Sequence, residues 1–183
     1  MSNASPDVVL QTELTNASSV DLSQAVVDLF DAHHQAIFGY LYRMAGRDRE
    51  LAEELTQETF LKAFQARDQL PRIVNHRAWL YRVATNLALN ARKRRSRFRW
   101  LPWSRAPEAR TSIDALQGAE IRLDLERALD RLPPSLRAPL LLSAVQGLSA
   151  REIAQALEIS EGAVRTRLYR AREQLRAIFQ EDV

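Results

Sequence analysis

The side chains in this sequence best suited to chemistry are arginines near its C-terminal end, and the chemistry they suit is binding to nucleic acid. Five of them fall within twelve residues and leave one side of a helix apolar: Arg165, Arg167, Arg170, Arg172 and Arg176. A guanidinium group bridges the acceptors of guanine in the major groove or clamps a phosphate oxygen. The same pattern also occurs on solvated helices, so an ordinary helical hairpin is the alternative interpretation.

A second cationic cluster lies in the middle of the chain, where residues 92–99 hold six arginines and lysines. Cations that neutralise phosphates gain affinity by releasing counterions. Upstream on the same predicted helix stand Trp79, Tyr81, Arg82, Asn86 and Asn90, and such side chains can stack on or hydrogen-bond to unpaired bases. The sequence favours nucleic acid here, with an anionic membrane surface as the main competitor and Trp79 equally suited to a core.

An acidic segment, residues 47–64, has the opposite character. Its glutamates and Gln57 stand beside apolar Leu55, Phe60 and Leu61 on one predicted helix. We expect either an ordinary acidic surface or a docking face for a basic partner protein.

Enzymatic motifs are missing from the sequence. It has no cysteine, no glycine-rich phosphate loop, no HExxH pair and no serine elbow. His33 and His34 are adjacent and would point to different sides of a helix, and His76 stands alone. We therefore expect no catalytic residue, no metal, no cofactor and no small-molecule substrate.

The elements that position these residues are predicted to be helices only, in two small domains on a flexible linker. Residues 1–20 are expected to be a mobile tail, 21–96 a three-helix domain, 97–112 the linker and 113–183 a domain containing a helix-turn-helix. Helix-capping residues mark the predicted starts: Asp21, Asp48, Asn75, Ser135, Ser149 with Glu152, and Ser160. The last two predicted helices flank a tight turn at Glu158, where glycine is common, and this arrangement presents its second helix to the DNA major groove.

Charge is strongly segregated along the chain. Residues 1–58 hold ten acids and three bases, a net charge of −7, whereas residues 59–99 hold eleven bases and one acid, a net charge of +10. We expect two kinds of partner, one basic and one anionic. No stretch approaches the roughly 18 apolar residues of a membrane span, and no signal peptide is evident, so we expect a cytoplasmic protein without membrane insertion.

Three segments together resemble the extracytoplasmic-function sigma factors, which direct bacterial RNA polymerase to promoters. The first, AEELTQETFLKAF, resembles the polymerase-docking helix of that family, and the second, RAWLYRVATNLALNARKRR, the helix that reads the minus-ten element. The third runs from LPPSLRAP to YRAREQL and is similar to the domain that binds the minus-thirty-five element. Glu54, Asn90 and the GAVRTRLYRAR stretch depart from the commoner residues of the family.

The resemblance implies a function and partners: binding of core RNA polymerase and promoter DNA, in response to a stress or signal, with control by an anti-sigma factor. It implies a polymerase-binding set of Glu54, Leu55, Gln57, Glu58 and Leu61. It implies a minus-ten set of Asn75, Trp79, Arg82, Asn86, Arg92, Lys93, Arg94 and Arg95, with the loop at 67–76 capturing a flipped base. It implies a minus-thirty-five set of Ser160, Arg165, Thr166, Arg167, Arg170 and Arg172, and a linker with Trp100 and Trp103 that threads through the polymerase.

The remaining alternative is a helix-turn-helix regulator that binds DNA but not core polymerase. The acidic helix separates the two interpretations, because a plain regulator needs no polymerase-docking face.

Overall fold

The computed structural model describes the backbone of residues 6–98 and 118–181 and the side chains of residues 21–95 and 124–180. These residues form helices and no strand, which confirms the all-α prediction. In chain order the elements are α1 (Pro6–Met44), α2 (Arg49–Gln65), the 3₁₀ helix η1 (Arg67–Arg72), α3 (His76–Phe98), α4 (Gly118–Arg131), α5 (Pro134–Ala144), α6 (Ala150–Leu157) and α7 (Glu161–Glu181).

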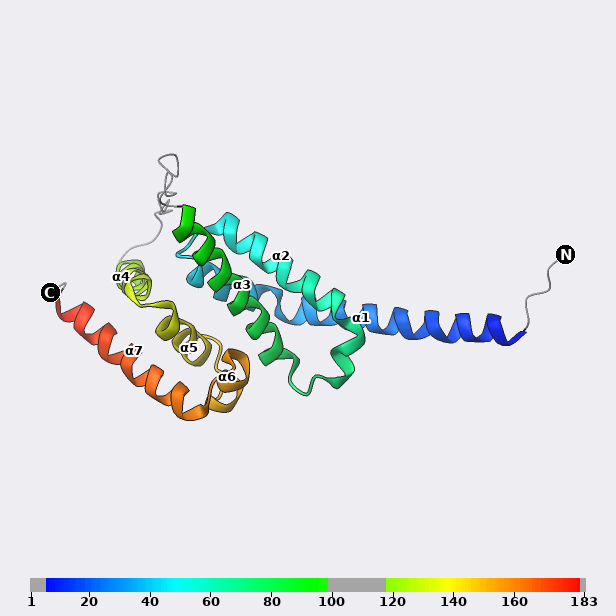
Figure 1. Ribbon diagram of the computed structural model, residues 1–183. Coiled ribbons are helices and arrows are strands. Elements are labelled where there is room, and N and C mark those ends of the chain that lie inside the picture. Colours follow the sequence, from blue (N-terminus) through cyan, green and yellow to red (C-terminus); the bar gives the residue numbers. More distant parts are fainter. Residues whose placement is uncertain (1–5, 99–117, 182–183) are drawn as a thin grey trace.

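Helix α1 is longer than the sequence predicted. It begins at Pro6 rather than at Asp21, so the predicted start and the predicted cap are wrong. Proline is well placed at the first helical position, and neither glycine nor proline follows until Gly39, so nothing in the sequence breaks the helix near Asp21. Figure 1 shows the first turns of α1 extending well beyond the rest of the molecule.

The N-terminal domain packs α1, α2 and α3 around one another, and its predicted caps are confirmed. The Asp48 side chain accepts a hydrogen bond from the Leu51 N–H at 3.0 Å, and that of Asn75 accepts from the Ala78 N–H at 2.9 Å. Two successive residues with positive φ, Gly46 at 71° and Arg47 at 66°, turn the chain sharply between α1 and α2. The region predicted as a loop near residue 70 is the short helix η1.

The C-terminal domain contains the predicted helix-turn-helix. Ser149 and Glu152 form a complete capping box at the start of α6, and the Ala163 N–H donates to the Ser160 hydroxyl at the start of α7. The prediction of Ser135 as the cap of α5 is wrong, because that helix starts one residue earlier, at Pro134, with Pro133 as its N-cap. Proline at this position lacks only an N–H that would have no helical partner.

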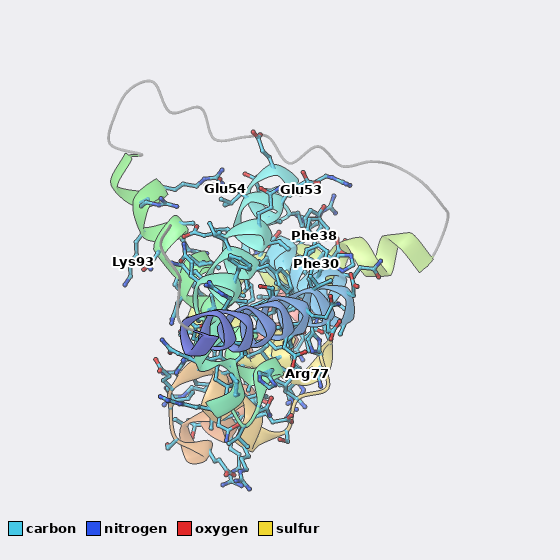
Figure 2. All side chains as sticks on the ribbon, turned by 90° about the vertical axis from the view of Figure 1, so that its right-hand side faces the viewer. Phe30, Phe38, Glu53, Glu54, Arg77 and Lys93 are labelled. Atoms are coloured by element: carbon cyan, nitrogen blue, oxygen red, sulfur yellow. The ribbon has the colours of Figure 1, made fainter. Side chains whose placement is uncertain are left out.

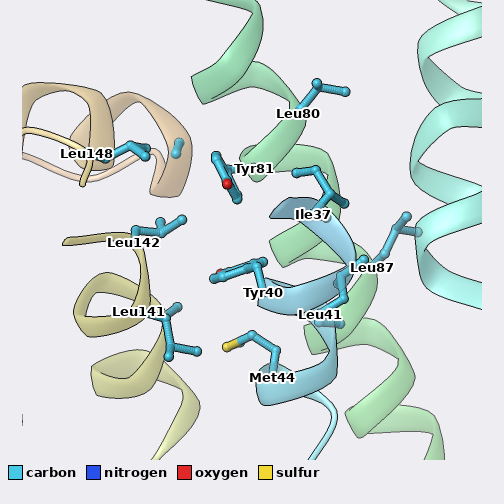
Figure 3. Close-up of a cluster of buried hydrophobic side chains, with 14 of the residues drawn as sticks. Ile37, Tyr40, Leu41, Met44, Leu80, Tyr81, Leu87, Leu141, Leu142 and Leu148 are labelled. Carbon is cyan, nitrogen blue, oxygen red and sulfur yellow. The ribbon is translucent and has the colours of Figure 1, made fainter. Parts of the chain in front are cut away.

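The two domains share one hydrophobic core, which the sequence did not indicate. Tyr40 and Met44 of α1 and Tyr81 of α3 are buried in one cluster with Leu141 and other apolar residues of the C-terminal domain. Figure 3 shows these side chains pointing toward one another across the boundary between the domains. The domains therefore lie in direct contact, with α3 against α6 and α1 against α5. The predicted linker falls mostly in residues 99–117, which lie outside the described residues, as do Trp100 and Trp103.

Candidate nucleic-acid interface

The outer face of α2 carries most of the predicted docking set. Glu54 and Gln57 are exposed, Glu58 is half-buried, and Leu61 keeps 55% of its surface exposed. Figure 2 shows Glu53 and Glu54 projecting from this helix away from the molecule. The prediction that Leu55 contacts a partner is wrong, because its side chain is fully buried in the core and cannot reach another protein.

Trp79, Arg82 and Asn86 meet in one groove between α2 and α3, with a volume of about 850 Å³. Trp79 is half-buried and packs against the core, and it also lines the groove. Helix α3 presents these residues together because they lie at spacings of three and four, on one side of the helix. The groove is lined by Glu58, Lys62, Gln65, Ala66, Gln69, Trp79, Arg82, Val83, Asn86, Leu87, Asn90, Arg94 and Glu158.

The cations at the end of α3 form an exposed cluster: Arg92, Lys93, Arg94 and Arg95. Arg95 also has a structural partner, since its guanidinium lies 2.7 Å from the Asp48 carboxylate that caps α2. Burial opposes ionisation of Asp48, but the Leu51 N–H and the Arg95 guanidinium hold its pKa below the ordinary value. The cluster therefore combines three outward cations with one that supports the start of α2.

Helix α7 presents its predicted residues to solvent on the side away from the core. Arg165, Arg170 and Arg172 are exposed and Arg167 is half-buried, whereas Val164, Leu168 and Ala171 are buried beneath them. Three members of the predicted set have local partners as well, and one of them is Arg165, whose guanidinium lies 3.8 Å from the Glu161 carboxylate. The Ser160 hydroxyl caps the helix, and the Thr166 hydroxyl donates to the Gly162 carbonyl at 3.0 Å.

The Asn75 side chain makes two hydrogen bonds. Its side-chain oxygen caps α3, and its side-chain amide donates to Glu152 of α6 at 3.3 Å. Hydrogen bonds from the Ser149 N–H and hydroxyl, together with the one from Asn75, lower the pKa of Glu152. Arg82 likewise reaches the other domain, where its guanidinium lies 3.1 Å from Glu158.

A third contact between the domains centres on Gln146, in the turn after α5. Its side-chain oxygen accepts from the Tyr81 hydroxyl at 2.7 Å, and its amide donates to the Ala36 carbonyl at 3.4 Å. Arg77 donates to the backbone carbonyl of Gln146, and Figure 2 shows Arg77 on the side of α3 that faces the C-terminal domain. Sequence reasoning missed Arg77 and Gln146 and grouped Tyr81 with the candidate base-binding residues, whereas Tyr81 is buried between the domains. Contacts between residues more than sixty apart leave no periodic signal.

Two of the histidines, His34 and His76, hydrogen-bond to backbone carbonyls. The His34 ring hydrogen-bonds to the Phe30 carbonyl and the His76 ring to the Leu70 carbonyl, and burial followed by the nearby Arg77 lowers the pKa of His33. Within the part of the chain whose side chains are described, no group of three acidic or histidine side chains gathers as metal ligands. Over that same part, no helix combines the length and the apolar character needed to cross a lipid bilayer.

The fold and these surfaces define a two-domain protein whose α3 and α7 both offer cationic faces and whose α2 offers an acidic one. Family comparison assigns each domain separately. Residues 29–98 match the model for sigma-70 region 2, and residues 122–175 match the model for sigma-70 region 4.

Relatives with known names carry the same two regions. The chain is 36% identical over 159 residues to the extracytoplasmic-function RNA polymerase sigma factor SigE of Mycolicibacterium smegmatis, covering 81% of this chain but only 59% of SigE. It is 36% identical to SigL of Mycobacterium tuberculosis, covering 84% of this chain and 88% of SigL. The chain belongs to the extracytoplasmic-function sigma factors.

Solved structures show the same fold. The sigma factor RpoE of Bartonella quintana, crystallised with the anti-sigma factor NepR, superimposes with a TM-score of 0.66 at 23% identity, covering 85% of this chain and 97% of RpoE. CnrH, in complex with the cytosolic domain of CnrY, superimposes with a TM-score of 0.64 at 25% identity, covering 90% of this chain and 96% of CnrH.

Proposed function

We propose that this chain directs transcription initiation by binding core RNA polymerase, recognising and melting a promoter, and thereby selecting a stress- or signal-responsive set of genes. The polymerase supplies the catalytic groups, and the chain itself is not an enzyme. Its site of action is the cytoplasm, where its two partners, core polymerase and promoter DNA, are found.

The observation that carries the proposal is the outer face of α2. Leu61 and Phe64 keep 55% and 45% of their surface exposed, next to the exposed Gln57 and Glu54. Large apolar side chains that stay exposed among acids are typical of a protein-docking surface. We assign this face, with Glu58 at its edge, to core polymerase.

Helix α3 is assigned to the minus-ten element. Trp79, Asn86 and Arg94 line a groove large enough for an unpaired base, and the exposed Arg92 lies near Arg94 on the same helix. Unstacking a base costs on the order of a few kcal/mol, and stacking on an aromatic ring with phosphate neutralisation offsets that cost. The loop around Asn75 is the proposed receiver of a flipped base.

Helix α7 is assigned to the minus-thirty-five element. Its first two turns hold Arg165, Thr166 and Arg167 beside the capping Ser160, and Arg170 and Arg172 follow. In a helix-turn-helix protein, the N-terminal end of the recognition helix contacts the bases in the major groove, and these residues lie at that end of α7. A regulator that binds only duplex DNA would use α7 in the same way, but it would leave the α2 face without a role.

We also propose an anti-sigma factor as a partner. The support is the shared fold with RpoE of Bartonella quintana, which was crystallised in complex with an anti-sigma factor. A regulator of that kind would mask surfaces on both domains.

The test is equilibrium binding of the purified chain to purified core polymerase, measured by fluorescence anisotropy. A sigma factor binds the core enzyme without DNA, and the Kd should lie in the nanomolar range, about −12 kcal/mol. A chain that binds duplex DNA but shows no affinity for core polymerase would be a plain regulator.

A further inference from the structure

The groove between α2 and α3 has two walls, and one of them, α3, carries Trp79, Asn86 and Arg94. The opposite wall belongs to α2 and to η1, which leads from the end of α2 into α3 (Figure 1). Four polar residues of this second wall follow one another at spacings of four, three and four, and all of them line the groove: Glu58, Lys62, Gln65 and Gln69.

The two walls differ in charge. On the α3 wall, Arg94 is exposed and unbalanced by a printed acid of its own helix, whereas on the opposite wall the Lys62 ammonium lies 3.9 Å from the Glu58 carboxylate. That pair balances its own charge and leaves Gln65 and Gln69 as neutral amides beside it. Cations bind phosphate oxygens without reading sequence, whereas amides hydrogen-bond to the edges of bases. A strand whose phosphates bind cations of α3 can therefore turn a base edge to the wall made by α2 and η1.

Gln69 is the amide best placed for such a base. It lies on η1, at the same end of the groove as Trp79, which is in the first turn of α3. Its side chain is exposed, and among the residues whose side chains the structure describes none hydrogen-bonds to it. The other amide of this loop is occupied, because Asn75 accepts from the Ala78 N–H and donates to Glu152.

A histidine fixes the position of η1 against α3. The His76 ring donates a hydrogen bond to the Leu70 carbonyl at 2.9 Å, and the Ile73 N–H donates to the same carbonyl at 3.0 Å. The Leu70 side chain is buried, so the residue next to Gln69 is held through both its backbone and its side chain. Because His76 begins the helix that carries Trp79, this hydrogen bond sets the separation of Gln69 from the indole.

We propose that Gln69 reads the edge of an unpaired adenine in this groove and that His76 is its positioning residue. A glutamine amide donates to a ring nitrogen of adenine and accepts from the adenine amino group, which is the pairing that glutamine favours. Trp79 supplies the stacking surface beside it. The inference rests on the proposed function and deepens it, because it names a base and the side chain that selects it.

The test is the affinity of the full chain for labelled oligothymidylates of 12 nucleotides, measured by fluorescence anisotropy at low salt. One central thymine is replaced in turn by adenine, cytosine or guanine. The wild-type chain should bind the adenine-containing strand about fivefold or more tightly than the all-thymine strand. Equal affinity of the wild-type chain for these two strands would overturn the proposal.

Variants of Gln69 assign the preference to its amide. Gln69→Ala should remove the preference for adenine and change affinity for the all-thymine strand less than about twofold, because the phosphate contacts stay in place. Gln69→Glu keeps the size of the side chain but removes its donor, and it should remove the preference as well. The matched control is Gln174→Ala, which removes an exposed amide of α7 and should leave the preference unchanged. A preference for adenine that survives in Gln69→Ala would overturn the role of Gln69.

The positioning role of His76 has its own readout, the ratio of the affinities for the adenine and the all-thymine strands. His76→Ala should lower this ratio toward one, and His76→Gln, whose amide can donate to the Leu70 carbonyl, should restore it. A merely structural role would weaken binding of both strands by the same factor, and that result would overturn the positioning role. These ratios need no polymerase, so a chain that prefers adenine but does not bind core polymerase would contradict the proposed function and leave this inference standing.

Discussion

Arg82 of α3 and Glu158, the C-cap residue that follows α6, form an ion pair across the two domains with 3.1 Å between the guanidinium and the carboxylate. Glu158 adopts a left-handed conformation with φ of 53°, where glycine would be free of strain. A left-handed non-glycine residue costs about 1–2 kcal/mol, whereas a solvent-exposed ion pair contributes about 0–1 kcal/mol. The pair alone does not offset the strain, so its value lies in the position it gives to α6 rather than in stability.

The docking face on α2 gives a first prediction. Replacing the exposed residues, Gln57→Ala with Leu61→Ala, should lower affinity for core polymerase at least tenfold without lowering the melting temperature. Leu55→Ala should behave in the opposite way, with a loss of about 2–5 kcal/mol of folding stability, because Leu55 is fully buried. Anisotropy with core polymerase and thermal unfolding followed by circular dichroism measure the two effects. Unimpaired binding by the Gln57 and Leu61 variant would show that this face does not contact the polymerase.

The recognition helix gives a second prediction. Arg165→Ala should cost about 1–3 kcal/mol on a cognate duplex and much less on scrambled DNA if the guanidinium reads a base. Arg176→Ala is the matched control, because that residue lies about three turns further along α7 and pairs with Glu173. If Arg165→Ala lowers affinity equally for cognate and scrambled duplexes, the Arg165 guanidinium contacts phosphate and reads no base.

The basic end of α3 gives a third prediction. Affinity for single-stranded DNA should fall with salt, and each phosphate-binding cation should contribute about 0.7 to the slope of log affinity against log salt. Arg92→Ala with Arg94→Ala should therefore lower the slope by about 1.4. Arg127→Ala removes a cation of α4 that pairs with Asp124, and it should leave the slope unchanged. A slope that is the same for all three proteins would place this cluster outside the DNA site.

The capping box of α6 gives a prediction about pH. Hydrogen bonds from Ser149, followed by that from Asn75, lower the pKa of Glu152 below its ordinary value of 4.5 in the folded chain. The folded state therefore holds this proton less tightly than the unfolded state, so the carboxylate stabilises the fold above pH 4.5 and loses that contribution as the pH falls through its lowered pKa. The Glu152→Gln variant keeps a side chain that can form the capping box, but this side chain has no carboxyl group to titrate. The wild-type chain should melt at a higher temperature than Glu152→Gln at pH 7, and the difference should shrink toward pH 3. A difference in melting temperature that stays constant between pH 7 and pH 3 would show that titration of Glu152 does not contribute to stability.

Arg137 gives a prediction about stability. It is buried, donates to the carbonyls of Arg43, Asp130 and Leu132, and pairs with the Asp130 carboxylate. Arg137→Ala leaves those acceptors unpaired and should cost about 3–5 kcal/mol in urea unfolding. The surface control Arg127→Ala should cost less than about 1 kcal/mol. Similar losses for the two variants would mean that water replaces the buried arginine.

Sequence patterns predicted most of the helices because their signals are local. The capping residues Asp48, Asn75 and Ser160 and the capping box at Ser149 each act within four residues of themselves, and all of them were found. The start of α1 was missed because aspartate is a common N-cap residue, which favoured a start at Asp21. No helix-breaking residue stands between Pro6 and Asp21, so the helix begins at Pro6.

The parts that were missed depend on contacts far apart in the sequence. Leu55 lies on the same helix as Leu61, and only the packing of α1 and α3 decides which of the two leucines is covered. The contact between the domains is of the same kind, since Gln146 meets Tyr81, which lies 65 positions earlier in the chain. Neither periodicity nor capping carries information at that range.

The most direct test of the account is run-off transcription with purified core polymerase, the full chain and a library of promoter fragments. The account predicts transcripts that start at defined positions only when the chain is present, and loss of those transcripts with Gln57→Ala plus Leu61→Ala. Core polymerase that initiates nowhere on the library with a folded, DNA-binding chain would contradict it.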